Sequence, residues 1–285
     1  MINILVSSKP VDGLFYYSYE YCTLLNEAGI DSQVVVVTHR DFEEQDYIHS
    51  IQSKYIHCKN IVFDNYIPSD DEITLIMGRS QMTLSWQEFN YSTPEQQKTL
   101  QAIFGNKLIS VYSENHPAKY PIALEFYSPQ HVVDLCDTEV YPNGVGEHFE
   151  KTINFSIYKT FDNDIKFKHL FLGTNKEYYA AVEEVIEQYP DHGILTYNAD
   201  YVNIDNNNVY VPVENLMSLF ETYVYTKKTF DPAPRIFQEC KYFGKDVIYL
   251  RDKSIIDGGS VYWKRDIKSP DITAILNAVE KLNGN

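Results

Sequence analysis

The beginning of the chain alternates between structure types in a way that few folds accommodate. An apolar run at residues 2–7 is followed by turn-forming residues at 9–13, and then by apolar side chains at helical spacing over 14–28. After Gly29, which favours the end of a helix, come four consecutive valines at 34–37. An unbroken run of β-branched residues is typical of a strand that is buried on both faces of a parallel sheet. The order strand, helix, buried strand predicts a βαβ unit.

The same alternation continues along the chain. Further elements are expected as strands at 60–63, 73–77, 107–112 and 132–135, and as a helix at 93–103. Turn residues cluster at 142–146, and beyond them the pattern restarts. In the second half the sequence predicts strands at 169–173, 193–197, 209–213, 222–225 and 246–250, and helices at 176–188, 216–221, 235–243 and 271–282. The predicted fold class is α/β, with two Rossmann-like doubly wound domains that face each other across a cleft and meet between residues 148 and 149.

The net charge restricts which partners the protein can bind. The 285 residues include 24 Lys and Arg against 40 Asp and Glu, so the formal net charge is -16. A surface that binds polyanions as a whole is disfavoured, because phosphate-backbone affinity comes from clustered Lys and Arg. Residues 1–150 hold 8 of the basic and 21 of the acidic side chains, which leaves 16 and 19 for residues 151–285. The first domain therefore carries nearly all of the net charge.

The four cysteines form no metal-binding pattern. They are Cys22, Cys58, Cys136 and Cys240, with neither a Cys-x-x-Cys motif nor a Cys/His spacing typical of zinc. We expect them to be reduced, mostly buried thiols. Neither a signal-peptide pattern nor an apolar run long enough to cross a bilayer is found, which predicts a soluble cytoplasmic protein with no membrane insertion.

Two acidic residues in the second half stand at a distinctive spacing. Residues 230–239 read Phe-Asp-Pro-Ala-Pro-Arg-Ile-Phe-Gln-Glu and are followed at 244–248 by Gly-Lys-Asp-Val-Ile. This segment resembles the GT-B family of glycosyltransferases, in which an acid, a seven-residue gap and a Glu precede Gly-Lys/Arg-Pro-Val-Ile. The resemblance implies that Glu239 binds the ribose hydroxyls of a nucleotide-sugar and that Asp231 lies near the donor sugar. It also implies that the helix start between them faces the diphosphate with free backbone N–H groups.

Other donor-binding residues follow from the same resemblance. Gly173, Thr174 and Lys176 stand where the family has Gly-Arg…Lys, a pair of cations that neutralises the diphosphate. Because Thr174 replaces the Arg, Arg235 is expected to supply the missing cation beside Lys176. The Gly-Gly-Ser turn that contains Gly259 is similar to the family's glycine-rich turn near the nucleotide.

Candidate catalytic residues lie in the first half. The segment Pro-Asn-Gly-Val before Gly146 resembles an interdomain motif of the family in which Asp follows these four residues. His116 resembles a histidine that reaches a hydroxyl of the donor sugar, and Glu114 is its rival for that role. Asp12, in the loop after the first strand, is the candidate base for the acceptor hydroxyl if the reaction inverts. Asp-Gly is also a common turn pair, and a retaining reaction needs no such base. Of the tyrosines in the helix that follows, Tyr16 is expected to contact ligand.

Metal binding and other enzyme classes are disfavoured. Asp162 and Asp164 form an Asp-x-Asp triplet, which holds a divalent metal in the other glycosyltransferase architecture. That architecture has a single domain, so a solvated loop is preferred here, and neither a metal nor a resident cofactor is expected. The sequence has no Gly-x-Gly-x-x-Gly after its first strand, no Walker motif and no Gly-x-Ser-x-Gly.

The resemblance implies an enzyme that moves a sugar from a UDP-based nucleotide diphosphate donor to an acceptor hydroxyl. Residues 1–148 would bind the acceptor and residues 149–285 the nucleotide-sugar. The Tyr- and Asn-rich, Ala-poor composition is similar to proteins of large AT-rich phages of the T-even kind, whose small GT-B enzymes glycosylate hydroxylated cytosines in DNA. A modified DNA base in a host cytoplasm is therefore the first acceptor candidate, whereas the acidic first domain favours a cell-surface glycan or a small molecule. A nucleotide-sugar epimerase and a catalytically silent nucleotide-sugar binder remain as alternatives.

Overall fold

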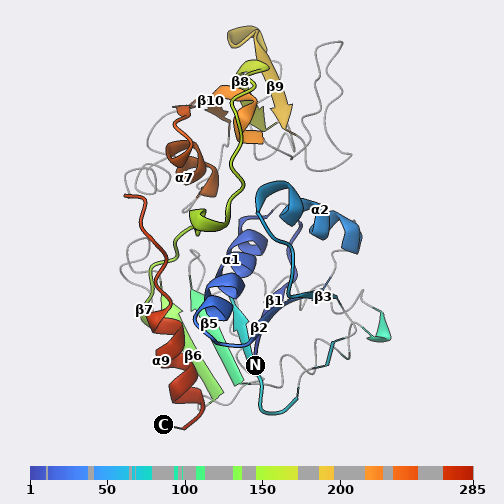
Figure 1. The fold of residues 1–285 in the computed structure, drawn as a ribbon, viewed down its shortest axis with the longest axis vertical. Coiled ribbons are helices and arrows are strands. Elements are labelled where there is room, and N and C mark those ends of the chain that lie inside the picture. The colour runs from blue at the N-terminus through green and yellow to red at the C-terminus, as the bar shows by residue number, and fades with distance from the viewer. Residues whose placement is uncertain are drawn as a thin grey trace. The chain divides into compact units, whose positions relative to one another are not determined.

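The chain forms two compact units. The computed structural model describes residues 1–10, 12–37, 42–63, 66–67, 69–78, 93–95, 98, 107–112, 131–136, 146–172, 186–195, 216–226, 234–249 and 266–284. Unit 1 consists of Met1–Tyr158 together with Lys268–Asn285, and unit 2 consists of Lys159–Ile267 (Figure 1). The chain thus leaves unit 1, builds unit 2 and returns.

Unit 1 contains a parallel sheet in a doubly wound strand order. Its strands are β1 (Ile2–Val6), β2 (Ser32–Val36), β3 (Ile61–Phe63), β4 (Ile73–Ile76), β5 (Lys107–Tyr112), β6 (Val132–Cys136) and β7 (Glu147–His148). Their order across the sheet is β3-β2-β1-β4-β5-β6-β7, and every pair is parallel. The order reverses between β1 and β4, where Ile4 lies opposite Val34 on one side and Leu75 on the other. In doubly wound folds this reversal marks the ligand-binding edge, at the carboxyl ends of the two strands.

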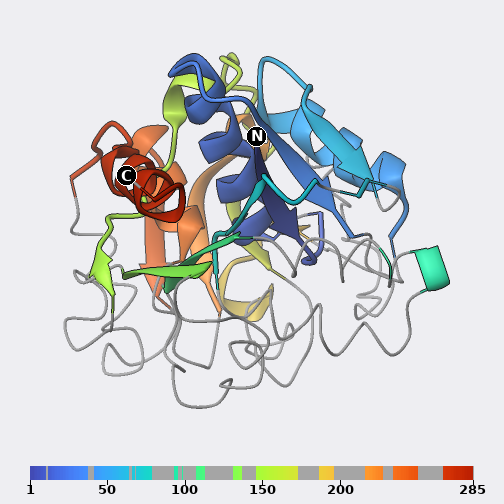
Figure 2. The same cartoon turned by 90° about the horizontal axis from the view of Figure 1, so that it is seen from below.

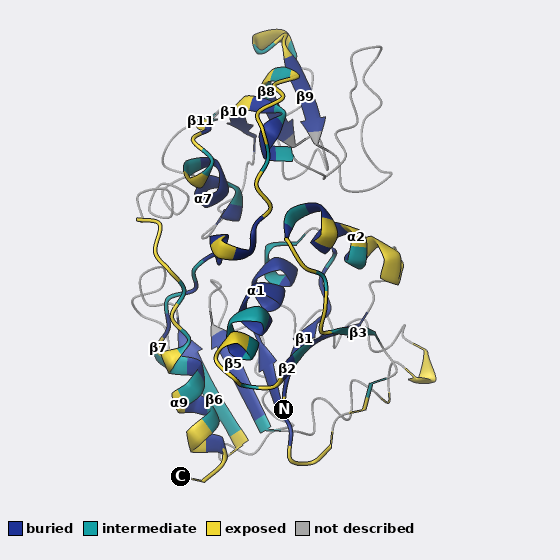
Figure 3. Ribbon diagram, in the orientation of Figure 1, coloured by how far each residue is buried: buried dark blue, intermediate teal, exposed yellow. Residues whose placement is uncertain are grey.

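The central strands are buried, as their sequences predict. All residues of β1 and β4 are buried, and β2 is buried except for Gln33 (Figure 3). A core cluster joins Leu5, Val35 and Ile76 from these strands to Leu108 of β5. Consecutive apolar residues suit strands that have covering layers on both faces.

The described helices of unit 1 come from three parts of the chain. They are α1 (Gly13–Glu27), α2 (Glu44–Lys54) and α9 (Thr273–Leu282), and a short 3₁₀ turn, η3, covers Phe155–Ile157. α1 packs against β1 and β2, and α9 packs against β5 and β6. Figure 2 shows α1 and α9 on the same side of this sheet. The first of these helices was predicted within one residue at each end, whereas α2 was not predicted.

The return of α9 places the end of the described chain in unit 1. Its buried residues are Ile275, Ala278 and Leu282. Polar contacts hold the returning segment against residues 147–150. The Lys268 ammonium donates to both carboxylate oxygens of Glu150 at 3.0 Å, and Lys281 donates to Glu147. The sequence-based boundary between 148 and 149 lies before the departure point at Tyr158, and sequence reasoning did not anticipate the return of the closing helix.

Unit 2 repeats the α/β arrangement on a smaller scale. Its described elements are β8 (Phe167–Leu172), β9 (His192–Leu195), the 3₁₀ turn η4 (Leu216–Ser218), β10 (Phe220–Tyr225), α7 (Arg235–Tyr242) and β11 (Asp246–Tyr249). The strands pair in parallel in the order β11-β10-β8-β9. Phe237 and Cys240 of α7 pack in a core with Leu170, Phe220 and Tyr223 of the sheet.

The predicted α/β class, with a parallel doubly wound sheet in each half of the chain, is confirmed, and one expected helix is partly wrong. The helix expected at 216–221 is wrong in its second half, because η4 ends at Ser218 and Phe220 and Glu221 belong to β10. Phe220 is fully buried, which an alternating strand allows. The strand expected at 209–213 lies outside the described residues, and the helices expected at 93–103 and 176–188 lie largely outside them.

The cysteines are free thiols, and three of them are buried. Cys22, Cys136 and Cys240 are buried, and Cys58 is half-buried. Burial raises the pKa of the Cys22 thiol to about 11, and burial also raises the pKa of the Cys240 thiol well above its usual value. Among the residues that the structure describes, no helix is long and apolar enough to cross a membrane.

Candidate functional site

Two sheet edges are where this architecture positions ligands. In unit 1 the edge lies at the carboxyl ends of β1 and β4, so the loop from Ser7 to Asp12 follows directly from it. In unit 2 the strand order reverses between β8 and β10, and α7 is the next described element after β10. The sequence-predicted residues that the structure describes, Asp12 on the first edge and Arg235 and Glu239 on the second, follow strands at these reversal points.

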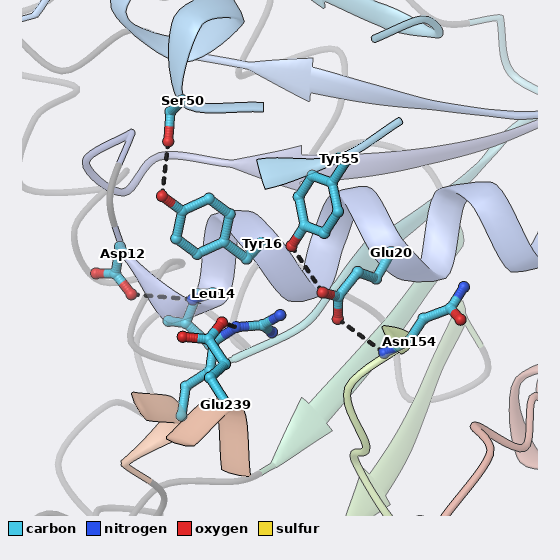
Figure 4. A network of polar contacts seen from close by, with 9 residues as sticks. Asp12, Leu14, Tyr16, Glu20, Ser50, Tyr55, Asn154 and Glu239 are labelled. Atoms are coloured by element: carbon cyan, nitrogen blue, oxygen red, sulfur yellow. Dashed lines mark hydrogen bonds and ion pairs between the residues drawn. The ribbon is translucent and has the colours of Figure 1, made fainter. Parts of the chain in front are cut away.

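Asp12 is the N-cap of α1. Its backbone is extended, with φ -74° and ψ 142°, and its Oδ1 accepts a hydrogen bond from the Leu14 N–H at 2.9 Å (Figure 4). Its own N–H donates to the Lys9 carbonyl at 3.0 Å. This is the turn chemistry that the Asp-Gly pair favours. Its role as a catalytic base stays a prediction.

Side chains from α1 and α2 hold the loop that carries Asp12. The Tyr47 hydroxyl donates to the Ser8 carbonyl at 3.0 Å, and Ser50 Oγ donates to the Pro10 carbonyl at 2.5 Å. The Tyr16 hydroxyl lies 2.7 Å from Ser50 Oγ (Figure 4). Because Ser50 has one proton and gives it to Pro10, Tyr16 is the donor in this pair.

Tyr16 is a packing residue in this structure. Its side chain is buried, and the Lys54 ammonium lies 3.7 Å from the centre of its ring. Its ring and hydroxyl face α2, and its contact with ligand stays a prediction. A cation over a tyrosine ring face is attracted by the ring's negative charge density, which holds both side chains in place.

Sequence reasoning missed the residues of α2. The segment is mostly polar, but Tyr47 and Ile51 are four residues apart and both are buried. Glu43 and Asp46 have the spacing of a capping box, and the Glu43 N–H donates to Asp46 Oδ2 at 2.7 Å. These two signals were available in the sequence.

A buried carboxylate joins α1 to the segment that leaves unit 1. Glu20 is fully buried, and its Oε1 accepts from the Tyr55 hydroxyl at 2.6 Å, while its Oε2 accepts from the Asn154 N–H at 3.2 Å (Figure 4). The Ile56 N–H donates to the Ile157 carbonyl at 2.9 Å in the same region. A buried carboxylate is tolerated when both oxygens are hydrogen-bonded. This network fixes the course of the chain up to the point where unit 1 ends.

In unit 2, two of the predicted donor-binding residues contact each other. Arg235 is the first residue of α7 and Glu239 lies one turn later, so their side chains share a helix face. Arg235 Nε donates to Glu239 Oε1 at 2.9 Å, and both side chains are buried. The short helix thus presents a cation and a carboxylate in a fixed arrangement.

Most of the remaining candidates lie outside the described residues. These are Glu114, His116, Gly173, Thr174, Lys176, Asp231 and Gly259. Their roles stay predictions.

The Asp-x-Asp triplet belongs to a loop that is tied to unit 2. Asp164 is exposed and its Oδ1 accepts from Lys166 Nζ at 2.8 Å, while its N–H donates to the Ser218 carbonyl at 3.0 Å. The intervening Asn163 accepts from Lys245 Nζ at 2.9 Å. Within the described part of the chain no three His, Cys, Asp or Glu side chains gather as metal ligands.

Gly146 has a structural reason for differing from the family motif. Its φ is +110°, and a Cβ there would lie 2.5 Å from the Asp134 carbonyl oxygen of the neighbouring strand β6. Neither the backbone angle nor the space suits an Asp at this position.

Comparisons with solved structures define the fold further. An alpha-glucosyltransferase in complex with UDP and a 13-mer DNA containing a central A:G mismatch aligns over 99% of this chain and 89% of its own, with a TM-score of 0.50 and 11% identity. The chain has the GT-B fold. A UDP-N-acetylglucosamine 2-epimerase aligns over 99% and 89% at a TM-score of 0.42 and 10% identity. The glycosyltransferase SsfS6 from Streptomyces sp. SF2575 aligns over 99% and 94% at 0.38 and 9%. No protein-family model and no curated protein sequence matches this GT-B chain.

Proposed function

We propose that the protein is a glycosyltransferase that uses a nucleotide diphosphate sugar, with uridine as the base. The observation that carries the proposal is the buried Arg235–Glu239 pair on the helix that follows β10, at the strand-order reversal of unit 2 in a GT-B fold. An anionic diphosphate needs a nearby cation, and a ribose diol needs a carboxylate acceptor. The helix that carries the pair supplies one of each.

The proposed donor site uses residues of unit 2. Glu239 accepts the ribose hydroxyls and Asp231 binds the sugar, while Arg235 and Lys176 neutralise the diphosphate. Departure of the diphosphate leaves an oxocarbenium-like sugar, so fixed positive charge at the leaving group lowers the barrier. Such a site needs no metal ion to stabilise the leaving group.

The proposed acceptor site uses residues of unit 1. If the reaction inverts, Asp12 takes the proton of the acceptor hydroxyl, and His116 or Glu114 contacts the sugar. A loop whose carbonyls are bonded to α2 gives Asp12 the fixed backbone that a general base requires.

The first acceptor to test is a hydroxylated cytosine base in DNA. The solved alpha-glucosyltransferase complex contains DNA, and this chain has the same fold. Unit 1 contains 11 basic and 23 acidic side chains, and unit 2 contains 13 basic and 17 acidic side chains. The acidity of unit 1 opposes a long DNA contact and favours the alternative, a cell-surface glycan or a small molecule.

Donor binding provides the test. Calorimetry with UDP and UDP-sugars should give binding to the wild type, and Glu239→Gln should weaken it by about tenfold or more because a charged hydrogen-bond acceptor is lost. Glu221→Gln is the matched control, since Glu221 is an exposed carboxylate of β10 in the same unit. Unchanged affinity in Glu239→Gln would refute the ribose assignment.

Turnover then separates the activities. UDP release should depend on an acceptor, supplied first as DNA with hydroxymethylated cytosines and then as glycans. Conversion of the donor without any acceptor would instead identify an epimerase. Binding without turnover under all conditions would identify a nucleotide-sugar binder.

A further inference from the structure

We propose that Tyr16, Tyr47 and Ser50 are positioning residues that hold the loop between β1 and α1, and with it Asp12, in register for the acceptor hydroxyl. The inference rests on the proposed function, because Asp12 acts as the base only there. The hydroxyl contacts themselves do not depend on that function.

The loop is held through its main-chain carbonyls. Ser8 and Pro10 are two residues apart, and each carbonyl accepts a hydrogen bond from a buried hydroxyl of α2. Because main-chain carbonyls are the acceptors, the contacts fix the backbone path of the loop rather than the rotamer of one side chain. Asp12 follows two residues after Pro10, and its N–H closes the turn on Lys9.

Tyr16 connects the first turn of α1 to α2. Its N–H donates to the Asp12 carbonyl at 3.3 Å in the first turn of α1, and its hydroxyl donates to Ser50 on α2. Lys54 holds the ring from α2, one turn beyond Ser50. A shift of α2 would therefore move Pro10 through Ser50 and the N-cap of α1 through Tyr16.

Such coupling matters for a general base. The base must lie within about 2.6–3.2 Å of the hydroxyl oxygen whose proton it removes, and a misplacement of about 1 Å can cost roughly 100-fold in rate. Removing the Ser50 or Tyr16 hydroxyl loosens the loop without touching the Asp12 side chain. The expected signature is a fall in kcat with an unchanged KM for the donor, which binds in unit 2.

The chain offers matched controls on the same helices. Ser53 is a buried serine of α2 whose Oγ donates to the Ser50 carbonyl at 2.8 Å, within the helix. Tyr19 is a buried tyrosine of α1 whose hydroxyl donates to the His57 carbonyl. Ser53→Ala and Tyr19→Phe each remove a hydroxyl that donates to a main-chain carbonyl, but neither carbonyl belongs to the loop between β1 and α1.

The experiment compares Ser50→Ala and Tyr16→Phe with Ser53→Ala and Tyr19→Phe in the full-length protein. At saturating donor, kcat should fall by about tenfold or more in the first pair and stay within about twofold in the second, and Ser50→Thr should recover most of the loss. Amide exchange followed by NMR gives a readout that needs no substrate. The Asp12 and Leu14 amides should exchange about tenfold faster in the first pair only.

The two readouts separate the possible failures. If the wild type transfers no sugar to any acceptor, the proposed function fails, and amide exchange alone decides whether the hydroxyls hold the loop. Unchanged exchange at Asp12 and Leu14 in both Ser50→Ala and Tyr16→Phe would overturn the inference. Equal losses of kcat in Ser53→Ala would also overturn it, because a general weakening of α2 would then explain the effect.

Discussion

Gly146 and Gly29 both have positive φ but differ in the space around them. Gly146 has φ +110° and would place a Cβ against the Asp134 carbonyl, whereas Gly29 has φ +82° with no atom within 4 Å of a Cβ. A side chain would strain the backbone at both positions, and only at Gly146 would it also collide with main-chain atoms.

We expect Gly146→Ala to lower the free energy of unfolding by about 2 kcal/mol or more, and Gly29→Ala by about 1 kcal/mol. Urea unfolding of both variants measures the difference. Equal losses would show that the sheet at β6 and β7 moves apart to admit a methyl group.

Single residues also show what the sequence could reveal about the site. Arg235 and Glu239 are neighbours on one helix turn, so their contact follows from their spacing. Asp12 was found because it lies in the loop that follows the first strand. Tyr47 and Ser50 were missed as partners of Ser8 and Pro10, because about 40 residues separate these pairs and only the packing of α2 brings them together.

At the scale of elements, the carboxylate of Asp271 accepts hydrogen bonds from the first residue of α9. Asp271 Oδ1 accepts from Thr273 Oγ1 at 2.6 Å and from the Thr273 N–H at 2.8 Å. These bonds lower the pKa of the Asp271 carboxyl, with the side-chain bond as the larger cause. A group whose pKa is lower in the folded state stabilises that state above its unfolded-state pKa, and the contribution is lost as the pH falls through the folded-state pKa.

Asp271→Ala should therefore lower the free energy of unfolding at pH 7. Its difference from the wild type should shrink as the pH falls from about 4, where this carboxyl becomes protonated in the unfolded chain, through the lowered folded-state pKa. Chemical unfolding at pH 7 and pH 3 checks this. Asp266→Ala, which removes an exposed carboxylate just before this segment, is the control. A difference that is equally large at both pH values would contradict a stabilising role of the charge.

Elements differed in how well the sequence predicted them. β1, β2 and β4 are runs of buried apolar residues and were predicted within two residues at each end. The helix α2 was missed because its one buried stripe is narrow and two of its buried residues are serines, Ser50 and Ser53. Helices that bury polar side chains give a weak periodic signal.

At the scale of the molecule, unit 2 is an insertion into unit 1. The chain leaves after Tyr158 and re-enters at Lys268, and Lys268 pairs with Glu150 of the departing segment. The segment that leaves unit 1 and the segment that re-enters it therefore contact each other within unit 1. The sequence could not show this, because the apolar face of α9 does not reveal which sheet it covers.

Replacing residues 159–267 by a flexible Gly/Ser linker should leave unit 1 cooperatively folded. Deleting residues 268–285 should instead lower its free energy of unfolding by about 3–6 kcal/mol, since Ile275 and Leu282 lose their buried environment against β5 and β6. Urea unfolding followed by circular dichroism compares the two variants. An unfolded product from the first replacement, or an unchanged midpoint after the second deletion, would show that the units do not divide in this way.

The inserted arrangement has a consequence for synthesis on the ribosome. Residues 268–285 are translated after the whole of unit 2, so unit 2 can finish folding while β5 and β6 of unit 1 still lack α9. At about 5–20 residues per second, that gap lasts several seconds. During this interval the nascent chain exposes the apolar surface of β5 and β6 that α9 later covers, and such transiently exposed surface favours aggregation.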